Sequence, residues 1–221
     1  MKRLIPLLLA IALLLAAALL LTACGQPKNP YAEIEQNPVA TITLTDGSQM
    51  RFELYPQQAP NTVANFVKLA NDGFYDNQQI YRVVSNVLIQ SGDPENDGTG
   101  DPGYYIKGEF SENKFKGNTL SHMRGTISMA RKRDYDTGGS QFFIMEGSYP
   151  EYDGFYAAFG RIMDAQSLNV LDDIGSRPVD GNYRPLEKIV IQRIRVETFG
   201  VDYEPRTLEK EEIDNRKSKD K

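Results

Sequence analysis

The residues of this sequence that could do chemistry lie in or beside short apolar segments. Arg82 stands within Ile80-Tyr-Arg-Val-Val84, and Gln90 ends the next apolar run. Gln141 follows a pair of glycines, in Gly138-Gly-Ser-Gln-Phe-Phe-Ile144. Arginine and glutamine donate hydrogen bonds without titrating near neutral pH, so they suit chemistry by fixed charge rather than by proton transfer. Alternatively, Arg82 is an edge-strand residue whose guanidinium reaches solvent.

The composition excludes several other kinds of site. One His and one Cys among 221 residues cannot build a Cys/His zinc site or an intrachain disulfide. Ser121-His122 lacks a G-x-S-x-G elbow, so we expect His122 to be a hydrogen-bonded structural residue. The acidic run 93–98 resembles the start of a calcium loop, but Tyr104 stands where an EF-hand has Glu, which predicts a surface loop. The net charge of -5 and the pI near 5.1 argue against a nucleic-acid partner.

The elements that must position Arg82 and the two glutamines are mostly strands. Alternating or short apolar runs predict eight of them, and Asp46-Gly47 predicts a hairpin turn between the first two. Apolar residues at helical spacing predict two helices, one after a possible cap at Asn61-Thr62 and one over 167–174. We expect a mainly β fold, a closed eight-stranded antiparallel β-barrel capped by two α-helices, since closure removes exposed sheet edges. The predicted strands are 39–45, 50–54, 80–84, 87–90, 126–130, 141–145, 157–162 and 188–198.

Phe142 and Phe143 are adjacent in a predicted strand. Successive strand residues point to opposite faces, so one ring should enter the core while the other lines an outer groove.

The N-terminus has the features of an export signal. A basic start, Met1-Lys-Arg3, is followed by an apolar run that ends in Leu21-Thr-Ala-Cys24. This pattern is typical of a secretory signal peptide, and Leu-Thr-Ala-Cys resembles the lipobox of bacterial lipoproteins, in which cleavage precedes a lipid-modified Cys. We expect Cys24 to carry the lipid and to hold the protein at the extracytoplasmic side of the cell membrane. The alternative is a retained membrane helix, because about 20 apolar residues can span a bilayer.

Composition divides the chain into four parts. We expect a lipoprotein signal peptide over residues 1–23, a lipid-anchored flexible tether over 24–37, a single domain over 38–200, and a charged C-terminal tail over 201–221. The tail contains 11 charged residues within 206–221, which indicates a solvated helix or a disordered segment.

Four ordered motifs resemble the cyclophilin family. Tyr81–Asp93 is similar to the motif F-H-R-x-x-x-x-F-x-x-Q-x-G-D. Segments 128–131 and 139–144 resemble the second signature, Tyr156–Gly160 resembles the third, and 52–54 with 59–66 matches the early strand and helix. The resemblance runs from about Val39 to Phe199, and it implies a cyclophilin-like fold and peptidyl-prolyl cis/trans isomerase activity.

The resemblance also implies roles for named residues. Arg82 would be the key donor to the prolyl amide, with Gln90 and Gln141 orienting it or holding substrate backbone. Phe143, Leu88 and Val87 would grip the proline ring. The main chain at Ala130 and Arg131 would pair with the residues before proline, and Tyr156 would donate from the other side. Tyr152 could supply an aromatic wall. No cofactor or metal is implied, the partners would be proline-containing segments of unfolded or exported proteins, and we expect a monomer.

The sequence departs from the family pattern at several positions. Tyr81 replaces the usual His, and Val87 replaces the pocket Phe. Glu151 stands where Trp is frequent, and because this Trp is missing we expect weak cyclosporin binding. From the four motifs and the predicted export signal together, we expect an isomerase that accelerates proline-limited folding of exported proteins. The alternative is a catalytically weak module that binds proline-containing segments.

Overall fold

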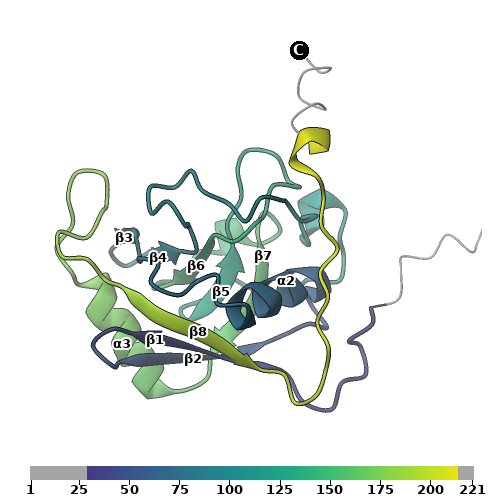
Figure 1. Cartoon of the computed structure of the whole chain (residues 1–221), viewed down its shortest axis with the longest axis horizontal. Helices are drawn as coiled ribbons and strands as arrows, with labels where there is room; N and C mark the ends of the chain where they lie inside the picture. Colours follow the sequence, from purple (N-terminus) through teal and green to yellow (C-terminus); the bar gives the residue numbers. More distant parts are fainter. Residues whose placement is uncertain (1–28, 214–221) are drawn as a thin grey trace, which may run out of the picture. The chain divides into compact units, whose positions relative to one another are not determined.

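The computed structural model describes residues 29–213, and the predicted signal peptide, Cys24 and the last eight residues lie outside this range. Eight antiparallel strands form one sheet in the order β3-β4-β6-β5-β7-β2-β1-β8 (Figure 1). Its strands are β1 (Val39–Leu44), β2 (Gln49–Leu54), β3 (Arg82–Val84), β4 (Leu88–Ser91), β5 (Thr126–Met129), β6 (Phe142–Met145), β7 (Ala157–Ile162) and β8 (Ile191–Glu197).

The sheet curls into an open half-barrel, so the prediction of a closed barrel is not confirmed. Strands β3 and β8 are its two edges, and β3 has only three residues. The chain before each edge strand makes a short contact instead, an isolated antiparallel bridge between Gln79 and Val190. Backbone hydrogen bonds from Ile80 to Ile189 and from Ile191 to Gln78 flank this bridge, so the contact shields part of both edges.

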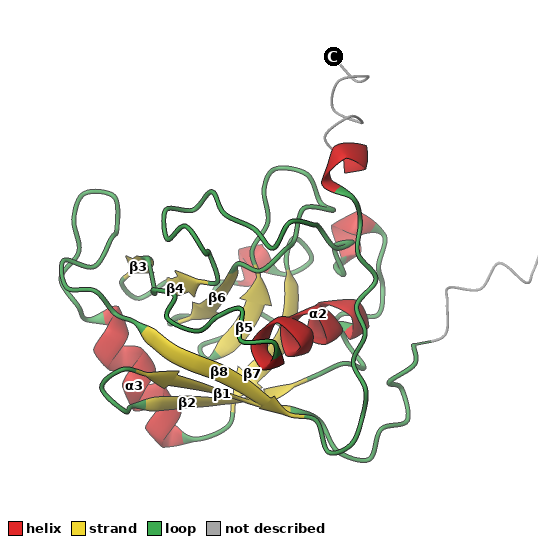
Figure 2. Ribbon diagram, viewed as in Figure 1, coloured by secondary structure: helices red, strands yellow, loops and turns green. Residues whose placement is uncertain are grey.

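Two α-helices pack against the sheet, α2 (Pro60–Asn71) against β8 and β7, and α3 (Ala165–Gly175) against β2. Figure 2 shows that loops join most of the short strands, and these loops include the 3-10 turns η1 (Ser111–Asn113) and η2 (Pro150–Tyr152). Helix α3 begins two residues before the predicted range of 167–174, because the side chain of Asp164 accepts the N–H of Ser167 at 2.8 Å and caps the first turn.

Helix α2 is capped differently from the prediction. It begins at Pro60, so Asn61 and Thr62 lie inside its first turn rather than at the cap. Their free N–H groups are satisfied from elsewhere in the chain, since the carboxylate of Glu109 accepts both, at 3.0 and 2.7 Å. Burial raises the pKa of this carboxyl group, against the opposing effect of these hydrogen bonds.

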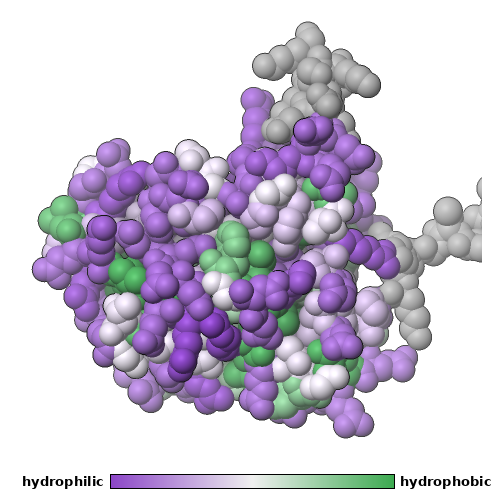
Figure 3. Space-filling view, viewed as in Figure 1, coloured by the Kyte–Doolittle hydropathy of each residue, from purple (hydrophilic) through white to green (hydrophobic). Residues whose placement is uncertain are grey.

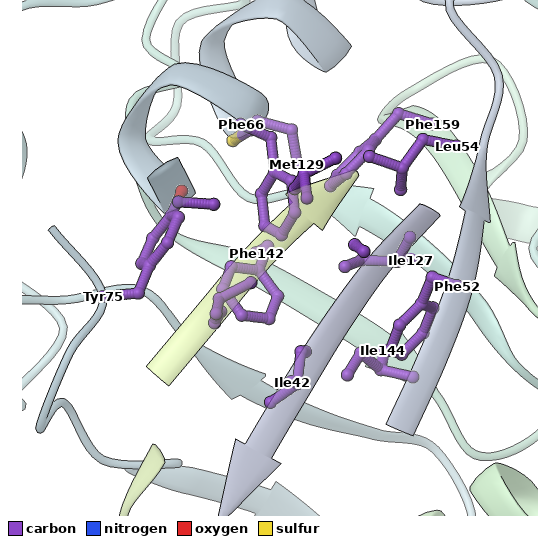
Figure 4. Packing of buried hydrophobic residues seen from close by; sticks show 14 of the residues in the cluster. Ile42, Phe52, Leu54, Phe66, Tyr75, Ile127, Met129, Phe142, Ile144 and Phe159 are labelled. Atoms are coloured by element: carbon purple, nitrogen blue, oxygen red, sulfur yellow. The ribbon is translucent and has the colours of Figure 1, made fainter. Parts of the chain in front are cut away.

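The main core fills the space between the curled sheet and the two helices. Phe66 on α2 meets Phe142 on β6 edge to face, with ring centroids 5.4 Å apart, and Phe159 on β7 lies 5.1 Å from Phe66 (Figure 4). All three rings are almost fully buried. This aromatic cluster fixes β6 from its inner side, which leaves the outer side of β6 available for a second cluster.

Both ends of the described chain pack on the domain more closely than predicted. Within the expected tether, Tyr31 is buried and stacks on Tyr203, with centroids 4.7 Å apart. Within the expected tail, Leu208 and Tyr105 exchange two backbone hydrogen bonds, and Ile213 is 3% exposed. The compact unit therefore begins at Tyr31 and includes residues 201–213, in which Tyr203 and Ile213 are buried and Leu208 is partly buried.

The surface seen in Figure 3 is mostly hydrophilic, and its apolar residues form small, separate patches. None of the helices between residues 29 and 213 has both the length and the apolar character needed to cross a membrane.

Candidate active site

Arg82 and Gln90 are directly opposite each other in the pairing of β3 with β4. The guanidinium of Arg82 donates to the side-chain oxygen of Gln90 at 3.0 Å. The next pairing into the sheet, between β4 and β6, places Gln90 opposite Phe143. Arg82 and Gln90 are eight residues apart, and Phe143 is 53 residues further along the chain, yet the three lie side by side across three neighbouring strands.

Tyr81 joins the two glutamines. Its hydroxyl accepts the amide N–H of Gln90 at 2.6 Å and donates to the side-chain oxygen of Gln141, also at 2.6 Å. Burial raises the pKa of Tyr81, so the hydroxyl keeps its proton throughout the physiological range. The residue that replaces the usual His thus connects Arg82, through Gln90, to Gln141.

Gln141 extends this network to a loop. Its amide nitrogen donates to the carbonyl oxygens of Gly98 and Gly100, at 3.2 and 2.9 Å. Asp93 is buried at the base of the same loop and accepts backbone N–H groups from residues 95, 97 and 98. Gly92 permits the turn that leads into Asp93, because its φ is +87° and a Cβ there would overlap the carbonyl oxygen of Ser140.

A second apolar cluster lies on the outer side of β4 and β6. Phe143, Leu88 and Met145 are its buried members, and they are 4%, 5% and 0% exposed. Phe142 belongs to the main core and Phe143 to this cluster, as the alternation along a strand predicts. The partly buried residues around them are Val84, Val87, Ala130, Tyr149, Tyr152 and Tyr156.

Tyrosines form one wall of this apolar cluster. The rings of Tyr152 and Tyr156 meet the ring of Phe143 edge to face, at 6.0 and 5.4 Å between centroids. Tyr149 stacks on Tyr152 at 6.0 Å. Glu151 is exposed, so the aromatic surface at this place comes from the neighbouring Tyr152.

His122 supports the apolar cluster from behind. Its Nδ1 lies 2.9 Å from the carboxylate of Asp153, and its Nε2 lies 3.0 Å from the hydroxyl of Ser128. The imidazole is fully buried, and desolvation lowers its pKa although Asp153 opposes that shift. Since Ser128 is also fully buried, this Ser-His-Asp arrangement lies out of reach of a substrate.

The side chain of Arg131 links the strand end at Ala130 to the tyrosine wall. Its guanidinium lies 4.7 Å from the ring centroid of Tyr156 and 4.9 Å from that of Tyr135. It also donates to the carbonyl oxygen of Phe155 at 3.0 Å. These contacts hold the main chain at Arg131 at a fixed position relative to Tyr156.

A cavity of about 580 Å³ lies beside Arg82. Arg82, Gln90, Gln141, Ala130 and Arg131 all line it, so the predicted polar residues and the predicted main-chain contact share one space. Residues from the loop between α3 and β8 complete its wall, among them Arg184. Within residues 29–213, no three His, Cys, Asp or Glu side chains are grouped so that they could hold a metal ion.

The structure brings all the predicted site residues of the domain together, and it adds others that the motifs did not indicate. Tyr81 departs from the family pattern, so the sequence marked its position as unusual. The sequence did not indicate that its hydroxyl joins the two glutamines. Tyr149 and Met145 join the apolar cluster, and Tyr183 presents its ring to the Arg82 guanidinium at 5.9 Å. Tyr183 lies 101 positions after Arg82, so no local spacing could have indicated this contact.

The chain is similar to known peptidyl-prolyl cis-trans isomerases. The family described as cyclophilin type peptidyl-prolyl cis-trans isomerase/CLD matches residues 39–196. The chain is 48% identical over 119 residues to peptidyl-prolyl cis-trans isomerase B of Bacillus subtilis, an alignment that covers 54% of this chain and 79% of the relative. It is 43% identical over 130 residues to a peptidyl-prolyl cis-trans isomerase of Synechococcus elongatus, which covers 59% and 84%.

Solved structures give the same result. A cyclophilin type peptidyl-prolyl cis-trans isomerase of Cryptosporidium parvum is similar with a TM-score of 0.64 and 31% identity, over 73% of this chain and 98% of that one. The same protein in the presence of the dipeptide Ala-Pro gives a TM-score of 0.63 over 72% and 99%. The motifs, the half-barrel and the matched range therefore agree, and the chain belongs to the cyclophilin type family of peptidyl-prolyl cis-trans isomerases.

Proposed function

We propose that this isomerase accelerates proline-limited folding of exported proteins, and that Arg82 is its principal catalytic donor. The observation that carries the proposal is the position of Arg82, whose guanidinium is held by Gln90 at 3.0 Å while Gln90 pairs with Phe143 across the next strand. A fixed cation and an apolar pocket for a ring are thus adjacent. A prolyl residue presents both features that this pair can bind, a five-membered ring and an amide.

The chemistry needs no covalent step. Rotation about an X–Pro bond faces a barrier of about 20 kcal/mol, because the amide has partial double-bond character. Twisting the amide localises electrons on the prolyl nitrogen and moves the carbonyl oxygen. A donor already in place can stabilise this twisted state more than the planar one. The guanidinium of Arg82 stays charged at every physiological pH, so it can act without a proton transfer.

The remaining site residues would hold the substrate while the bond turns. Leu88, Phe143 and Val87 would bind the ring, and Tyr152 would close one side. Gln90 would keep Arg82 oriented by direct contact, and Gln141 would hold Gln90 in place through the Tyr81 hydroxyl. The main chain at Ala130 and Arg131 would pair with the residues before proline. Tyr156 would donate from the opposite wall.

Proline-containing segments of unfolded proteins are the proposed substrates. A relative at 31% identity was solved in the presence of the dipeptide Ala-Pro, which supports a proline-containing ligand for this chain as well. The export signal in the sequence supports clients that have themselves been exported. We propose that the protein is anchored by lipid at Cys24 on the extracytoplasmic side of the cell membrane. Mass spectrometry of the N-terminal peptide tests the anchor, since an unmodified Cys24 behind an intact Met1 would contradict it.

A binding module with little turnover is the second candidate, and Val87 favours it. Valine is smaller than the Phe usual at this position, so the pocket holds a proline ring with less contact area. Binding of a proline-containing peptide without any increase in the isomerisation rate would support this candidate.

A refolding assay separates the two candidates. The full-length chain in mild detergent is added to a protein whose refolding has a slow proline phase, and the rate of that phase is measured. We expect acceleration by the natural chain and its loss in Arg82→Ala. No acceleration by the natural chain, together with measurable peptide binding, would contradict the enzyme and favour the module.

A further inference from the structure

The cavity beside Arg82 carries positive charge in a protein that is acidic overall. Four cationic residues line it, Arg82, Arg131, Lys132 and Arg184, against two acidic ones, Asp97 and Asp101. The whole chain has a net charge of -5. A concave site concentrates the field of the charges that line it, so this surplus acts on whatever enters the cavity.

The charge of Asp101 is offset twice. Its carboxylate lies 3.5 Å from the ammonium of Lys132 and 2.9 Å from that of Lys210. Lys210 belongs to the segment after residue 196, beyond the part of the chain that matches the family. Asp101 is 12% exposed, so the two ammonium groups leave little negative charge at that side of the cavity.

Arg184 is held at the mouth of the cavity by its own loop. The carboxylate of Asp180 accepts the N–H groups of Asn182 and Arg184, at 2.8 and 2.9 Å. The carbonyl oxygen of Tyr183 accepts the N–H of Val83 at 2.9 Å, which fastens the loop to β3. The backbone of Arg184 is thereby fixed near Arg82, while its side chain is exposed.

Arg184 is better placed than Arg131 to receive an anion. The Arg131 guanidinium already donates to three carbonyl oxygens and lies among aromatic rings. The Arg184 guanidinium contacts the carbonyl oxygen of Asp97 at 3.4 Å, which is a neutral group. The Asp97 carboxylate accepts from the N–H and hydroxyl of Thr99. The carboxylates of Asp97 and Asp180 lie near enough for the Arg184 charge to lower their pKa, so they offset part of that charge.

We propose that this cavity selects substrates with an Asp or Glu side chain within three residues before the proline, and that Arg184 contacts the carboxylate. The proposal rests on the proposed function, in which the main chain at Arg131 pairs with the residues before proline. Arg131 lines the same cavity, so the substrate residues that pair with its main chain would lie next to the cavity.

The test compares peptides that differ at one position. Glu, Gln or Lys is placed one, two or three residues before proline, and kcat/KM is measured with the full-length chain in mild detergent. We expect Glu to exceed Gln by about two- to fivefold at one of these positions, the effect of a partly exposed ion pair. The preference should shrink in 1 M salt, because the Debye length there is about 3 Å.

Two variants identify the residue responsible. Arg184→Glu should reverse the preference, so that Lys exceeds Gln at the same position. Arg193→Glu is the matched control, since it makes the same charge change on the exposed side of β8, away from the cavity, and it should keep the preference for Glu. Equal rates for Glu and Gln at all three positions, or an unchanged preference in Arg184→Glu, would overturn the proposal.

Failure of the proposed function gives a different result. If no peptide is isomerised faster than in buffer, the catalytic proposal fails, and the same peptides are then compared by fluorescence anisotropy. Tighter binding of Glu than of Gln peptides, lost in Arg184→Glu, would still support the selective cavity. Equal binding would overturn it.

Discussion

The imidazole ring of His122 lies nearly parallel to the ring of Phe143, with centroids 5.9 Å apart and planes inclined by 19°. Asp153 and Ser128 hold the two ring nitrogens, so the imidazole cannot rotate without breaking a buried hydrogen bond. The side chain that would bind proline therefore rests on a polar side chain fixed from both ends. The single His of the chain supports the site without touching a substrate.

His122 should make the stability of the protein depend on pH. Burial lowers its pKa in the folded state, while the unfolded chain has the ordinary value of about 6.5. As the pH falls below about 6.5, His122 binds a proton in the unfolded state but stays neutral in the folded state. The free energy of unfolding therefore decreases. The slope can reach about 1.4 kcal/mol per pH unit.

Denaturant unfolding between pH 8 and pH 5 measures this effect, with His122→Gln as the comparison. Glu109 acts in the opposite direction, because burial raises its pKa, but it is present in both proteins and cancels in the difference. A difference between the two curves that does not change with pH would contradict the assignment.

Replacing Arg82 by Lys should abolish most of the activity. Lysine keeps the charge but not the planar group that donates to Gln90 and to substrate together. Loss of one preorganised donor typically lowers the rate on the order of 10²-fold. A peptide isomerisation assay checks this, with Arg51→Lys on the exposed side of β2 as control. Activity of Arg82→Lys equal to that of the Arg51→Lys control would exclude a specific role for the guanidinium.

Tyr81→Phe should weaken the site without removing it. The variant loses the hydroxyl that joins Gln90 to Gln141, although the two glutamines keep a direct hydrogen bond of 3.2 Å. We expect kcat/KM to fall by about five- to tenfold, equivalent to one buried hydrogen bond of roughly 1 kcal/mol.

Tyr55→Phe is the matched control for Tyr81→Phe. It removes a tyrosine hydroxyl that donates to Glu53, outside the site, at 3.1 Å. It should leave kcat/KM unchanged, and an equal loss in both variants would show that the effect of Tyr81→Phe is not specific.

Val87→Phe should improve the hold on proline. A phenyl ring in place of the isopropyl group, beside Leu88 and Phe143, adds apolar contact with the proline ring. This contact is worth about 1 kcal/mol, which lowers KM roughly fivefold. Steady-state kinetics with a proline peptide measure it, and the midpoint of thermal unfolding shows whether the protein remains folded. An unchanged KM with a lower kcat would mean that the natural pocket is already filled.

Sequence periodicity was sufficient to predict a residue's environment where that environment depends only on the residue's own strand. The division of Phe142 and Phe143 between two clusters follows from alternation alone. Eight antiparallel strands were also predictable from apolar runs and turns. Closure of the barrel was not, because it depends on how far β3 and β8 extend toward each other, and that is decided by tertiary contacts near Gln79 and Val190.

The packing of residues 203–208 could not be predicted for a similar reason. Its composition is that of a solvated segment, but Tyr203 packs on Tyr31 and Leu208 pairs with Tyr105, partners far away in the sequence. The cap of α2 shows the same limit, since it is supplied by Glu109 from 47 residues further along. Contacts of this kind leave no trace in local spacing.

The stacking of Tyr31 on Tyr203 has a topological consequence. Tyr31 is the first residue of the compact unit and Tyr203 lies ten residues before the end of the described chain, yet their ring centroids are 4.7 Å apart. The pair therefore closes the chain between them into a loop without a covalent bond, and the segment after Tyr203 continues from this junction to pair with Tyr105. A contact of this kind restricts the positions of both ends of the domain together, as a cross-link would.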